Sequence, residues 1–257
     1  MYRAMNKSNK EASFGFKKVA REVKTGLVDQ VFSSVASKYD LMNDIMSLGV
    51  HRLWKDRMVR EVPVQDGAHI LDMAGGTGDI AFRIFRKYQN LGKDLNLTIS
   101  DYNQNMLDEG KVRSIDENII GDNIRWQKEN GESTSFQDDE FDLYTIAYGI
   151  RNFANLEQGV NEAARIVKKG GKFLCLEFNQ VENEAFKKLY DFYSFNVIPA
   201  IGGMVTGDKE SYDYFVESIR MFPKSEDFVQ MLKDAGFKSA KFEKLTFGLT
   251  TLYIAER

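Results

Sequence analysis

A glycine-rich loop is the first feature of the sequence that could do chemistry. The apolar run of residues 70–73 leads into Gly75, Gly76, Thr77 and Gly78, and a helical pattern follows. Glycines allow the backbone to approach a ligand closely, and the start of a helix presents unpaired N–H groups to it. Sites for dinucleotides, nucleotides and methyl donors all use such a loop, so the loop by itself predicts a small-molecule site without naming the ligand.

Three features around the loop distinguish these ligands. No Gly-Lys-Ser/Thr sequence follows the glycines, which excludes a triphosphate-binding loop. Asp72 lies just before the glycines, where its carboxylate would repel a pyrophosphate and attract a cationic ligand. Asp101 ends the next apolar run, where it can accept hydrogen bonds from a ribose diol. S-adenosylmethionine meets these conditions, because it has a ribose, an ammonium group and a sulfonium but no phosphate.

Asn130 and Gly131 complete this predicted site, since they follow the third apolar run, where the adenine would lie. Two alternatives stay open at this point. The loop could be an ordinary glycine turn, with Asp72 and Asp101 serving as helix caps. A nicotinamide-dependent oxidoreductase would also use the loop, although Asp72 fits its pyrophosphate poorly.

Alternating elements must position these residues. From residue 68 onward, short apolar runs alternate with helical patterns. This alternation predicts an α/β fold with right-handed crossovers and a mostly parallel sheet that helices cover on both faces. Seven strands are expected, at residues 69–74, 95–100, 124–127, 141–147, 172–178, 240–246 and 248–256, the last two forming an antiparallel hairpin. Helices are expected over residues 79–88, 103–113 and 156–167.

The segments outside the sheet are expected to be helical. Residues 1–66 are predicted to form an N-terminal helical cap, with helices over 27–39 and 53–62, on a main unit of residues 67–257. The two parts are expected to make effectively one domain.

An aromatic insertion at about residues 183–222 is either a helical layer packed on the domain or a hydrophobic lid over a substrate. Beyond it, Ser225 is expected to cap a helix and Gly236 to end that helix. Cys175, within a predicted strand, is expected to be an inert core residue.

Composition limits the classes of function. Apolar residues make up 43% of the 257 residues, which is enough for a packed core. The 35 basic and 38 acidic residues give a net charge of −3, so no nucleic-acid partner is expected. One cysteine and two histidines predict neither an internal disulfide nor a metal site. No apolar run approaches the roughly 18 residues that would predict a membrane span.

A long motif adds a family resemblance. Residues 39–54 read Tyr-Asp-Leu-Met-Asn-Asp-Ile-Met-Ser-Leu-Gly-Val-His-Arg-Leu-Trp, which resembles the N-terminal signature of the ubiquinone/menaquinone C-methyltransferases. Residues 74–79, 149–153, 176–178 and 211–219 extend the resemblance along nearly the whole chain. It implies a Rossmann-like class I methyltransferase that uses S-adenosylmethionine. Its substrate would be a polyprenylated benzoquinol or naphthoquinol, methylated on a ring carbon.

The resemblance also implies the residues that bind the methyl donor. These are Asp72, Gly75, Gly76, Thr77, Gly78, Asp101, Tyr102, Asn130, Gly131 and Ala147. The family often has Ser where Ala147 stands and Phe where Tyr148 stands, so one hydroxyl contact to the donor is lost here. This departure motivates a further alternative, a non-catalytic structural subunit of a quinone-biosynthesis assembly.

Methylation of a ring carbon needs a neighbouring phenolic oxygen to lose its proton. Arg151 is the favoured group to stabilise the resulting phenolate, and a structural ion pair is its alternative role. His51 is a candidate base or, equally, a histidine of helix packing, and Tyr39 is expected to close over the donor. The substrate pocket is expected to be lined by Tyr148, Asp208 and Tyr212.

A polyprenyl substrate also suggests partners and a location. We expect peripheral contact with a membrane, a homodimer, and contact with other quinone-biosynthesis proteins. Arg3, Lys7 and Lys10 give the first ten residues a basic character. This character favours the matrix side of the mitochondrial inner membrane, with a bacterial cytoplasm as the alternative.

Overall fold

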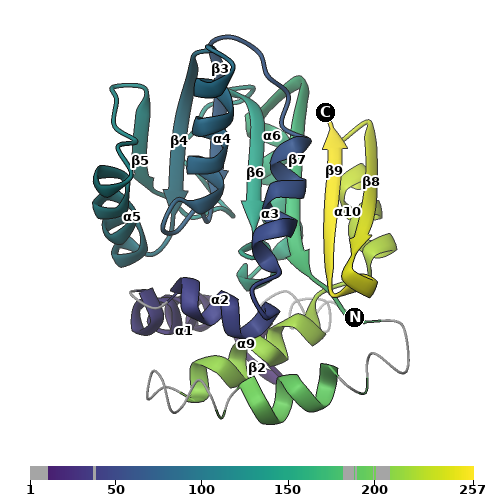
Figure 1. Ribbon diagram of the computed structural model, residues 1–257. Helices are drawn as coiled ribbons and strands as arrows, with labels where there is room; N and C mark the ends of the chain where they lie inside the picture. The colour runs from purple at the N-terminus through teal and green to yellow at the C-terminus, as the bar shows by residue number, and fades with distance from the viewer. Residues whose placement is uncertain (1–10, 37–38, 182–187, 189, 199, 201–208) are drawn as a thin grey trace.

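A seven-stranded sheet forms the centre of the molecule (Figure 1). The computed structural model describes residues 11–36, 39–181, 188, 190–198, 200 and 209–257. The strands follow the spatial order β5 (Ile124–Lys128), β4 (Leu95–Asp101), β3 (Ala68–Met73), β6 (Phe141–Ala147), β7 (Val167–Phe178), β9 (Thr250–Glu256) and β8 (Ser239–Leu245). The first five run parallel, and β9 is antiparallel to its neighbours β7 and β8.

The central strands are apolar on both faces, and successive residues enter two different cores. In β3, Ile70 packs into one cluster and Leu71 into the other. Leu143 and Tyr144 divide in the same way in β6. This division follows from the pleat, which points neighbouring side chains to opposite faces. Both faces of the sheet therefore need a covering layer of helices.

Helices cover both faces. On one side, α3 (His51–Arg60) packs beside α4 (Asp79–Asn90), and both contact the sheet (Figure 1). On the other side, α6 (Leu156–Ile166) and α10 (Ser225–Asp234) contact β7, β8 and β9. The helix α5 (Gln104–Asp116) packs on the β4–β5 edge. The Rossmann-like α/β fold with a closing antiparallel hairpin, expected from the sequence, is confirmed.

A further layer lies at the carboxyl ends of the parallel strands, at the bottom of Figure 1. It contains α1 (Arg21–Val35), α2 (Tyr39–Ser47), α9 (Lys209–Met221) and a hairpin of β1 (Glu11–Phe14) with β2 (Lys17–Ala20). Short turns complete the described chain: η2 (Ile150–Asn152), the π-helical turn η3 (Tyr193–Val197) and η4 (Thr246–Gly248). Ligands of open α/β sheets bind at this end of the strands, so this layer is placed to cover a site.

Two local expectations were wrong. The helix predicted over residues 27–39 is two elements, because α1 begins at Arg21 and ends at Val35 before α2 begins at Tyr39. Ser225 does not cap α10, since Lys224 occupies that position. The Ser225 hydroxyl instead accepts a hydrogen bond of 2.7 Å from Asn179 Nδ2, and the side chain is buried. Gly236 does follow the end of this helix, at φ +107°.

The aromatic insertion is partly outside the described residues. In its described part, Tyr190, Tyr212 and Phe215 are buried in the same core cluster as the sheet and the N-terminal helices. These residues therefore pack on the domain, and a role of the insertion as a lid over a substrate stays a prediction. Cys175 is buried in the opposite core, as expected.

Candidate functional site

The glycine loop begins where β3 ends. Ala74 has φ +51°, an uncommon value for a residue with a side chain, and it turns the chain away from the sheet. A Cβ on Gly75 would lie 2.8 Å from Ile99 Cγ2 and 3.0 Å from Asp72 Oδ2, so that only glycine fits. Gly78 then occupies the left-handed region, at φ +84°, as the N-cap of α4. The strand end, the loop and the helix start thus form one tightly packed turn.

Asp101 joins this loop to the neighbouring strand β4. Its Oδ2 accepts a hydrogen bond of 3.0 Å from the Gly76 N–H, and its Oδ1 accepts one of 2.8 Å from the Asn103 N–H. Burial raises the pKa of Asp101 to about 6, against the opposing effect of these hydrogen bonds. The carboxylate therefore sits at the strand end where the sequence predicted a ribose partner.

Asp72 lies deeper, under the loop. Its Oδ1 accepts a hydrogen bond of 2.8 Å from Thr145 Oγ1, and its Oδ2 accepts one of 3.2 Å from the Ala81 N–H. Burial raises the pKa of Asp72 to about 7 in spite of these bonds. A cationic ligand would stabilise the ionised form, so this buried carboxylate fits a ligand with an ammonium or sulfonium group.

The ends of β5 and β6 supply the far wall. A Cβ on Gly131 would lie 2.4 Å from Phe153 Cζ, so the backbone after β5 packs directly on that ring. Tyr148, just after β6, has φ +58°, and its ring centroid lies 4.6 Å from that of Phe178. β3 and β6 each end in a tight turn. In each turn one residue beside the pocket, Ala74 or Tyr148, has an unusual backbone conformation. Such strain is typical of ligand sites.

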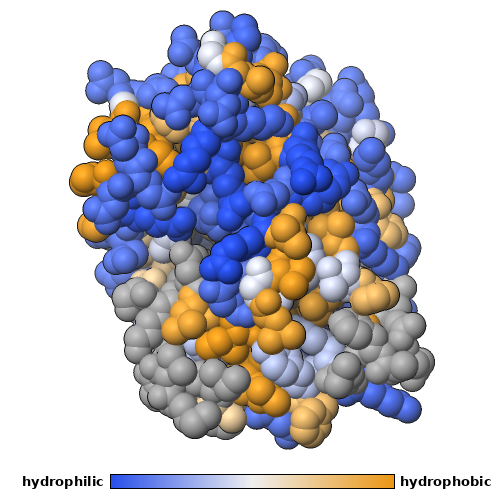
Figure 2. Space-filling model, viewed as in Figure 1, coloured by the Kyte–Doolittle hydropathy of each residue, from blue (hydrophilic) through white to orange (hydrophobic). Residues whose placement is uncertain are grey.

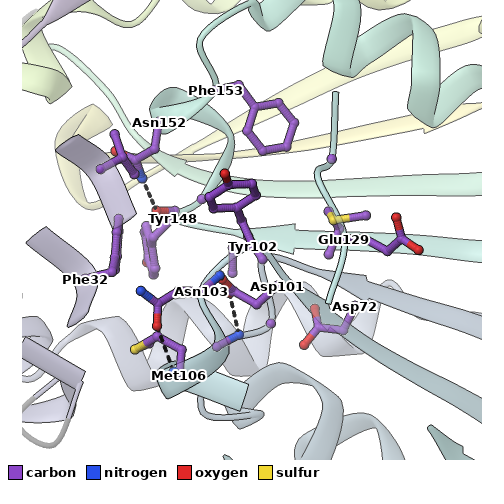
Figure 3. A pocket seen from close by; sticks show the side chains of 18 of the residues that line it. Phe32, Asp72, Asp101, Tyr102, Asn103, Met106, Glu129, Tyr148, Asn152 and Phe153 are labelled. Carbon is purple, nitrogen blue, oxygen red and sulfur yellow. Dashed lines mark hydrogen bonds between the residues drawn. The ribbon is translucent and has the colours of Figure 1, made fainter. Parts of the chain in front are cut away.

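One pocket brings most of the predicted residues together (Figure 3). Ten of them line it: Asp72, Gly75, Gly76, Thr77, Asp101, Tyr102, Asn130, Gly131, Ala147 and Tyr148. In the close view, Asp72 and Glu129 lie at one side, and Phe32 lies at the other. Gly78 shapes the loop behind them. The donor residues expected from the resemblance are therefore gathered in one place.

The helix α1 closes the pocket, and sequence reasoning missed its contribution. Thr25, Val28, Asp29 and Phe32 line the pocket from this side. The sequence already showed that the apolar two, Val28 and Phe32, share one face of a helix. Nothing in the spacing indicated that this face would lie on a ligand site rather than in the core.

Arg151 lies in a buried ion pair, the alternative role that the sequence left open. Its Nη1 lies 2.7 Å from Glu177 Oε1 and donates a hydrogen bond of 2.6 Å to the Tyr148 carbonyl oxygen. Its Nε donates to Ser218 Oγ at 3.2 Å. Arg151 is not among the described residues that line the pocket, whereas its neighbours Asn152 and Phe153 are. Its action on a substrate therefore stays a prediction.

The other predicted reactive residues lie elsewhere or outside the described part. His51 is buried at the start of α3, with Nε2 2.9 Å from Asp44 Oδ1, in the helix-packing position that was its alternative. Burial lowers the pKa of His51. Tyr212 is buried in α9, and neither it nor His51 lines this pocket in the described chain. For Tyr39 only the backbone is described, and Asp208 lies outside the described residues.

The described residues contain neither a cluster of metal ligands nor a membrane-spanning helix. No cluster of three or more His, Cys, Asp or Glu side chains could hold a metal ion there. Over the same residues, no helix combines the length and the apolar character needed to cross a membrane.

Comparison with known sequences identifies close relatives. The model of the ubiE/COQ5 methyltransferase family matches residues 17–257. A Rickettsia rickettsii protein named ubiquinone/menaquinone biosynthesis C-methyltransferase UbiE is 47% identical over 251 residues, which cover 98% of this chain and 99% of that protein. The Dictyostelium discoideum mitochondrial 2-methoxy-6-polyprenyl-1,4-benzoquinol methylase is 45% identical, covering 95% of this chain and 86% of that protein.

Solved structures support the fold. A methyltransferase from Haloferax volcanii, in complex with its Trm112 activator, matches with a TM-score of 0.62 over 88% of this chain and 96% of that one, at 16% identity. A SAM-dependent methyltransferase from Thermotoga maritima gives a TM-score of 0.61 over 88% and 98%, at 15% identity. At this level of identity the likeness concerns the class I methyltransferase fold.

Proposed function

The chain belongs to the ubiE/COQ5 methyltransferase family, and from this premise we propose that it transfers a methyl group from S-adenosylmethionine to a ring carbon of a polyprenylated hydroquinone. The proposed acceptor is a methoxy-benzoquinol, as in the name of the Dictyostelium relative, or a demethylated naphthoquinol in an organism that makes menaquinone. Its polyprenyl tail would need an apolar path beside the described pocket.

The observation that carries this proposal is the charge of the pocket wall. Asp72 and Asp101 line the pocket at the ends of adjacent parallel strands, on either side of the glycine loop. In this loop a Cβ on Gly75 would clash with Ile99. A pyrophosphate would meet these carboxylates, whereas a sulfonium or ammonium group would be stabilised by them. The pocket therefore supports a methyl donor over a nicotinamide dinucleotide.

When bound, S-adenosylmethionine supplies an electrophilic methyl group on a sulfonium. In this proposal Asp101 accepts the ribose hydroxyls, the backbone at Asn130 and Gly131 lies along the adenine, and Asp72 faces the cationic end. The tightly packed turn at Gly75 holds these contacts in fixed positions. Catalysis would then depend mainly on alignment of donor and acceptor, which is the principal contribution that a binding site can make to such a transfer.

We propose that Arg151 acts on the acceptor side as a fixed positive charge. Its guanidinium does not lose a proton at accessible pH, so it would stabilise a phenolate rather than act as the base. The ion pair with Glu177 holds it in place under the turn that carries Tyr148. The same contacts would also position that turn without any contact to substrate.

The location and partners are proposed on the same basis. Because relatives occur in a mitochondrion and in bacteria, the chain would act either on the matrix side of the mitochondrial inner membrane or in a bacterial cytoplasm. We propose peripheral contact with the membrane, a homodimer, and contact with other quinone-biosynthesis proteins. Sedimentation of the purified chain with and without detergent would test the dimer, and a monomer at all concentrations would contradict it.

The test of the activity is methyl transfer by the purified chain. It is incubated with S-adenosylmethionine carrying a labelled methyl group and with two reduced acceptors, a short-tailed methoxy-benzoquinol and a demethylmenaquinol. We expect label on the ring carbon of at least one acceptor. Asp101→Asn should abolish most of the transfer, whereas Asp116→Asn, an exposed acid on α5, should leave it unchanged. Binding of the donor without any transfer would favour the non-catalytic structural subunit.

A further inference from the structure

One basic side chain enters a pocket whose other charged residues are acidic. Among the described lining residues, the acidic ones are Asp29, Asp72, Asp79, Asp101, Glu129 and Glu132. The basic one is Lys55, which comes from α3 and is 3% exposed. Burial of an ammonium group is costly unless other groups satisfy its charge and its N–H donors. The position of Lys55 therefore needs an explanation.

An ion pair with Asp79 explains part of the burial of Lys55. Lys55 Nζ lies 2.6 Å from Asp79 Oδ2, which is the one hydrogen bond that the ammonium makes among the described residues. The other oxygen of Asp79 accepts a hydrogen bond of 2.8 Å from Arg83 Nε, and Arg113 Nη2 lies 4.0 Å from it. Although burial opposes it, the pKa of Asp79 is lowered by Lys55 and Arg83. Three cations thus surround this single carboxylate.

The charge of Asp79 is therefore already compensated from outside the pocket. Arg83, which does not line the described pocket, binds the carboxylate oxygen of Asp79 that Lys55 leaves, and it also pairs with Asp56. An ammonium group has three N–H donors, and Asp79 occupies one of those of Lys55. Positive charge and hydrogen-bonding capacity therefore remain on this pocket-lining side chain.

The loop and the helix start that line the same pocket also offer donor groups to an anion. They include Thr77, which is buried and lies in the glycine loop, and Ile80 in the first turn of α4. The N-cap of this helix, Gly78, has no side chain to bond the N–H groups of the first turn, although that of Ala81 donates to Asp72 Oδ2 at 3.2 Å. The first turn of a helix carries partial positive charge, which adds to that of Lys55.

We propose that Lys55 binds the carboxylate at the amino-acid end of the methyl donor. This inference rests on the proposed function and deepens it. The donor is zwitterionic at this end, and the pocket offers a complementary pair of charges: the buried carboxylate of Asp72 for the cationic groups and the ammonium of Lys55 for the carboxylate. Lys55 thereby links the N-terminal helices to recognition of the donor.

The consequence is selectivity for ligands that carry the carboxylate. Three ligands separate the parts of the donor: S-adenosylmethionine itself, decarboxylated S-adenosylmethionine, which keeps the sulfonium and the amine, and 5′-methylthioadenosine, which lacks the whole amino-acid end. Their dissociation constants would be measured by titration calorimetry, so no turnover is needed. We expect the wild-type chain to bind S-adenosylmethionine at least about tenfold more tightly than decarboxylated S-adenosylmethionine. This factor corresponds to the free energy of one hydrogen bond between charged groups.

Substitution of Lys55 should remove this selectivity. Lys55→Met is expected to weaken binding of S-adenosylmethionine about tenfold and to change binding of the other two ligands less than about twofold. Lys55→Arg keeps the charge and should bind S-adenosylmethionine several times more tightly than Lys55→Met. Asp79→Asn frees the ammonium from its internal partner and should keep the preference for the carboxylate. Thermal unfolding of each variant shows whether it is folded.

Lys87 provides a matched control. It also joins α4 to the α3 region, donating hydrogen bonds to the carbonyl oxygens of Val59 and Val62 at 2.9 and 2.7 Å, but it does not line the pocket. Lys87→Met should lower the unfolding temperature without changing the order of the three ligands.

Two outcomes would overturn the inference. If Lys55→Met weakens all three ligands equally, Lys55 supports only the shape of the pocket. If the folded wild-type chain binds S-adenosylmethionine no better than its decarboxylated form, no carboxylate subsite exists, although the proposed function would survive. Failure of the wild-type chain to bind any of the three would instead refute the proposed function itself, and this inference with it.

Discussion

Two pocket-lining carboxylates, Asp72 and Asp101, titrate near neutral pH because they are buried. The pKa of Asp72 is raised to about 7 and that of Asp101 to about 6, from an ordinary value of 3.8. Between the ordinary and the raised value the folded chain holds a proton that the unfolded chain has lost. Their contribution to the free energy of unfolding is therefore lost as pH rises from about 4 to about 7. A cationic donor would stabilise the ionised forms and reverse this trend in the complex.

We predict that binding of S-adenosylmethionine tightens as pH rises from 5 to 8. The reason is that both carboxylates must lose a proton before they can serve the ligand's cationic groups and ribose hydroxyls. Titration calorimetry in buffers of different ionisation enthalpy should show proton release on binding below pH 7. In Asp72→Asn the rise in affinity should be smaller. Affinity that is constant over this range would mean that neither carboxylate contacts the ligand.

A second residue-scale prediction concerns the buried pair of Arg151 and Glu177. Arg151→Met should lower the free energy of unfolding by about 3–5 kcal/mol, because it leaves the Glu177 carboxylate buried without its cation. The double variant Arg151→Met with Glu177→Met should recover most of that loss. Denaturant unfolding measures both values.

Methyl transfer by the double variant then separates the two roles of Arg151. If the guanidinium stabilises a phenolate, the refolded double variant stays inactive, with kcat reduced more than KM for the donor. If Arg151 only positions the turn at Tyr148, activity returns together with stability.

At the scale of elements, α1 is a cover that is attached on both sides of the pocket. On one side, Lys24 Nζ donates a hydrogen bond of 2.6 Å to the Phe153 carbonyl oxygen beyond β6. On the other, Asn103 at the start of α5 donates to Asp29 Oδ1 at 2.8 Å and to Ser33 Oγ at 2.7 Å. The helix therefore bridges the ends of β4 and β6 and forms one wall of the pocket.

We predict that Lys24→Met loosens this cover. Loss of a buried, charge-assisted hydrogen bond corresponds to about tenfold in an equilibrium constant. Stopped-flow release of S-adenosylhomocysteine should become faster by about that factor, and amides of residues 21–35 should exchange faster with solvent. Lys18→Met is the control, because that lysine is exposed and donates to Ser13 on the hairpin. An unchanged release rate in Lys24→Met would show that α1 does not gate the pocket.

The elements differ in how far the sequence predicted them. The strands and the glycine loop were predictable because β3 and β6 are apolar on both faces and because Asp72 and Asp101 lie in strand ends that must meet at one edge. A helical cap was expected, but its attachment beside the pocket was not, since the hydrogen bonds of Lys24 and Asn103 join residues far apart in the chain. Arg151 shows the same limit, because its partner Glu177 lies on the next strand and no local pattern pairs them.

At the scale of the whole molecule, a chain with a net charge of −3 carries several exposed apolar side chains. Leu48 and Leu53, before and within α3, are 75% and 67% exposed, and Phe247 in η4 is 74% exposed. Trp54 Nε1 donates a hydrogen bond of 2.9 Å to Thr246 Oγ1, which brings the segments of Leu53 and Phe247 together. Figure 2 shows apolar residues gathered across the middle and lower part of the face on which Figure 1 draws α3. An acidic protein gains little from anionic lipids, so contact with a bilayer would rest on such apolar groups.

We predict that this apolar surface, defined by Leu48, Leu53 and Phe247, mediates the proposed membrane contact. Replacement of all three by Ser should reduce co-sedimentation with phosphatidylcholine vesicles about tenfold or more, because each side chain contributes transfer free energy on insertion. Raising the salt concentration should have little effect, since the attraction is not electrostatic. Leu91→Ser, which changes an exposed leucine after α4, is the control and should bind vesicles like the wild-type chain. Binding of S-adenosylhomocysteine should be the same in every variant. If the triple variant still binds vesicles, or if salt releases the wild-type chain, the contact lies elsewhere on the molecule.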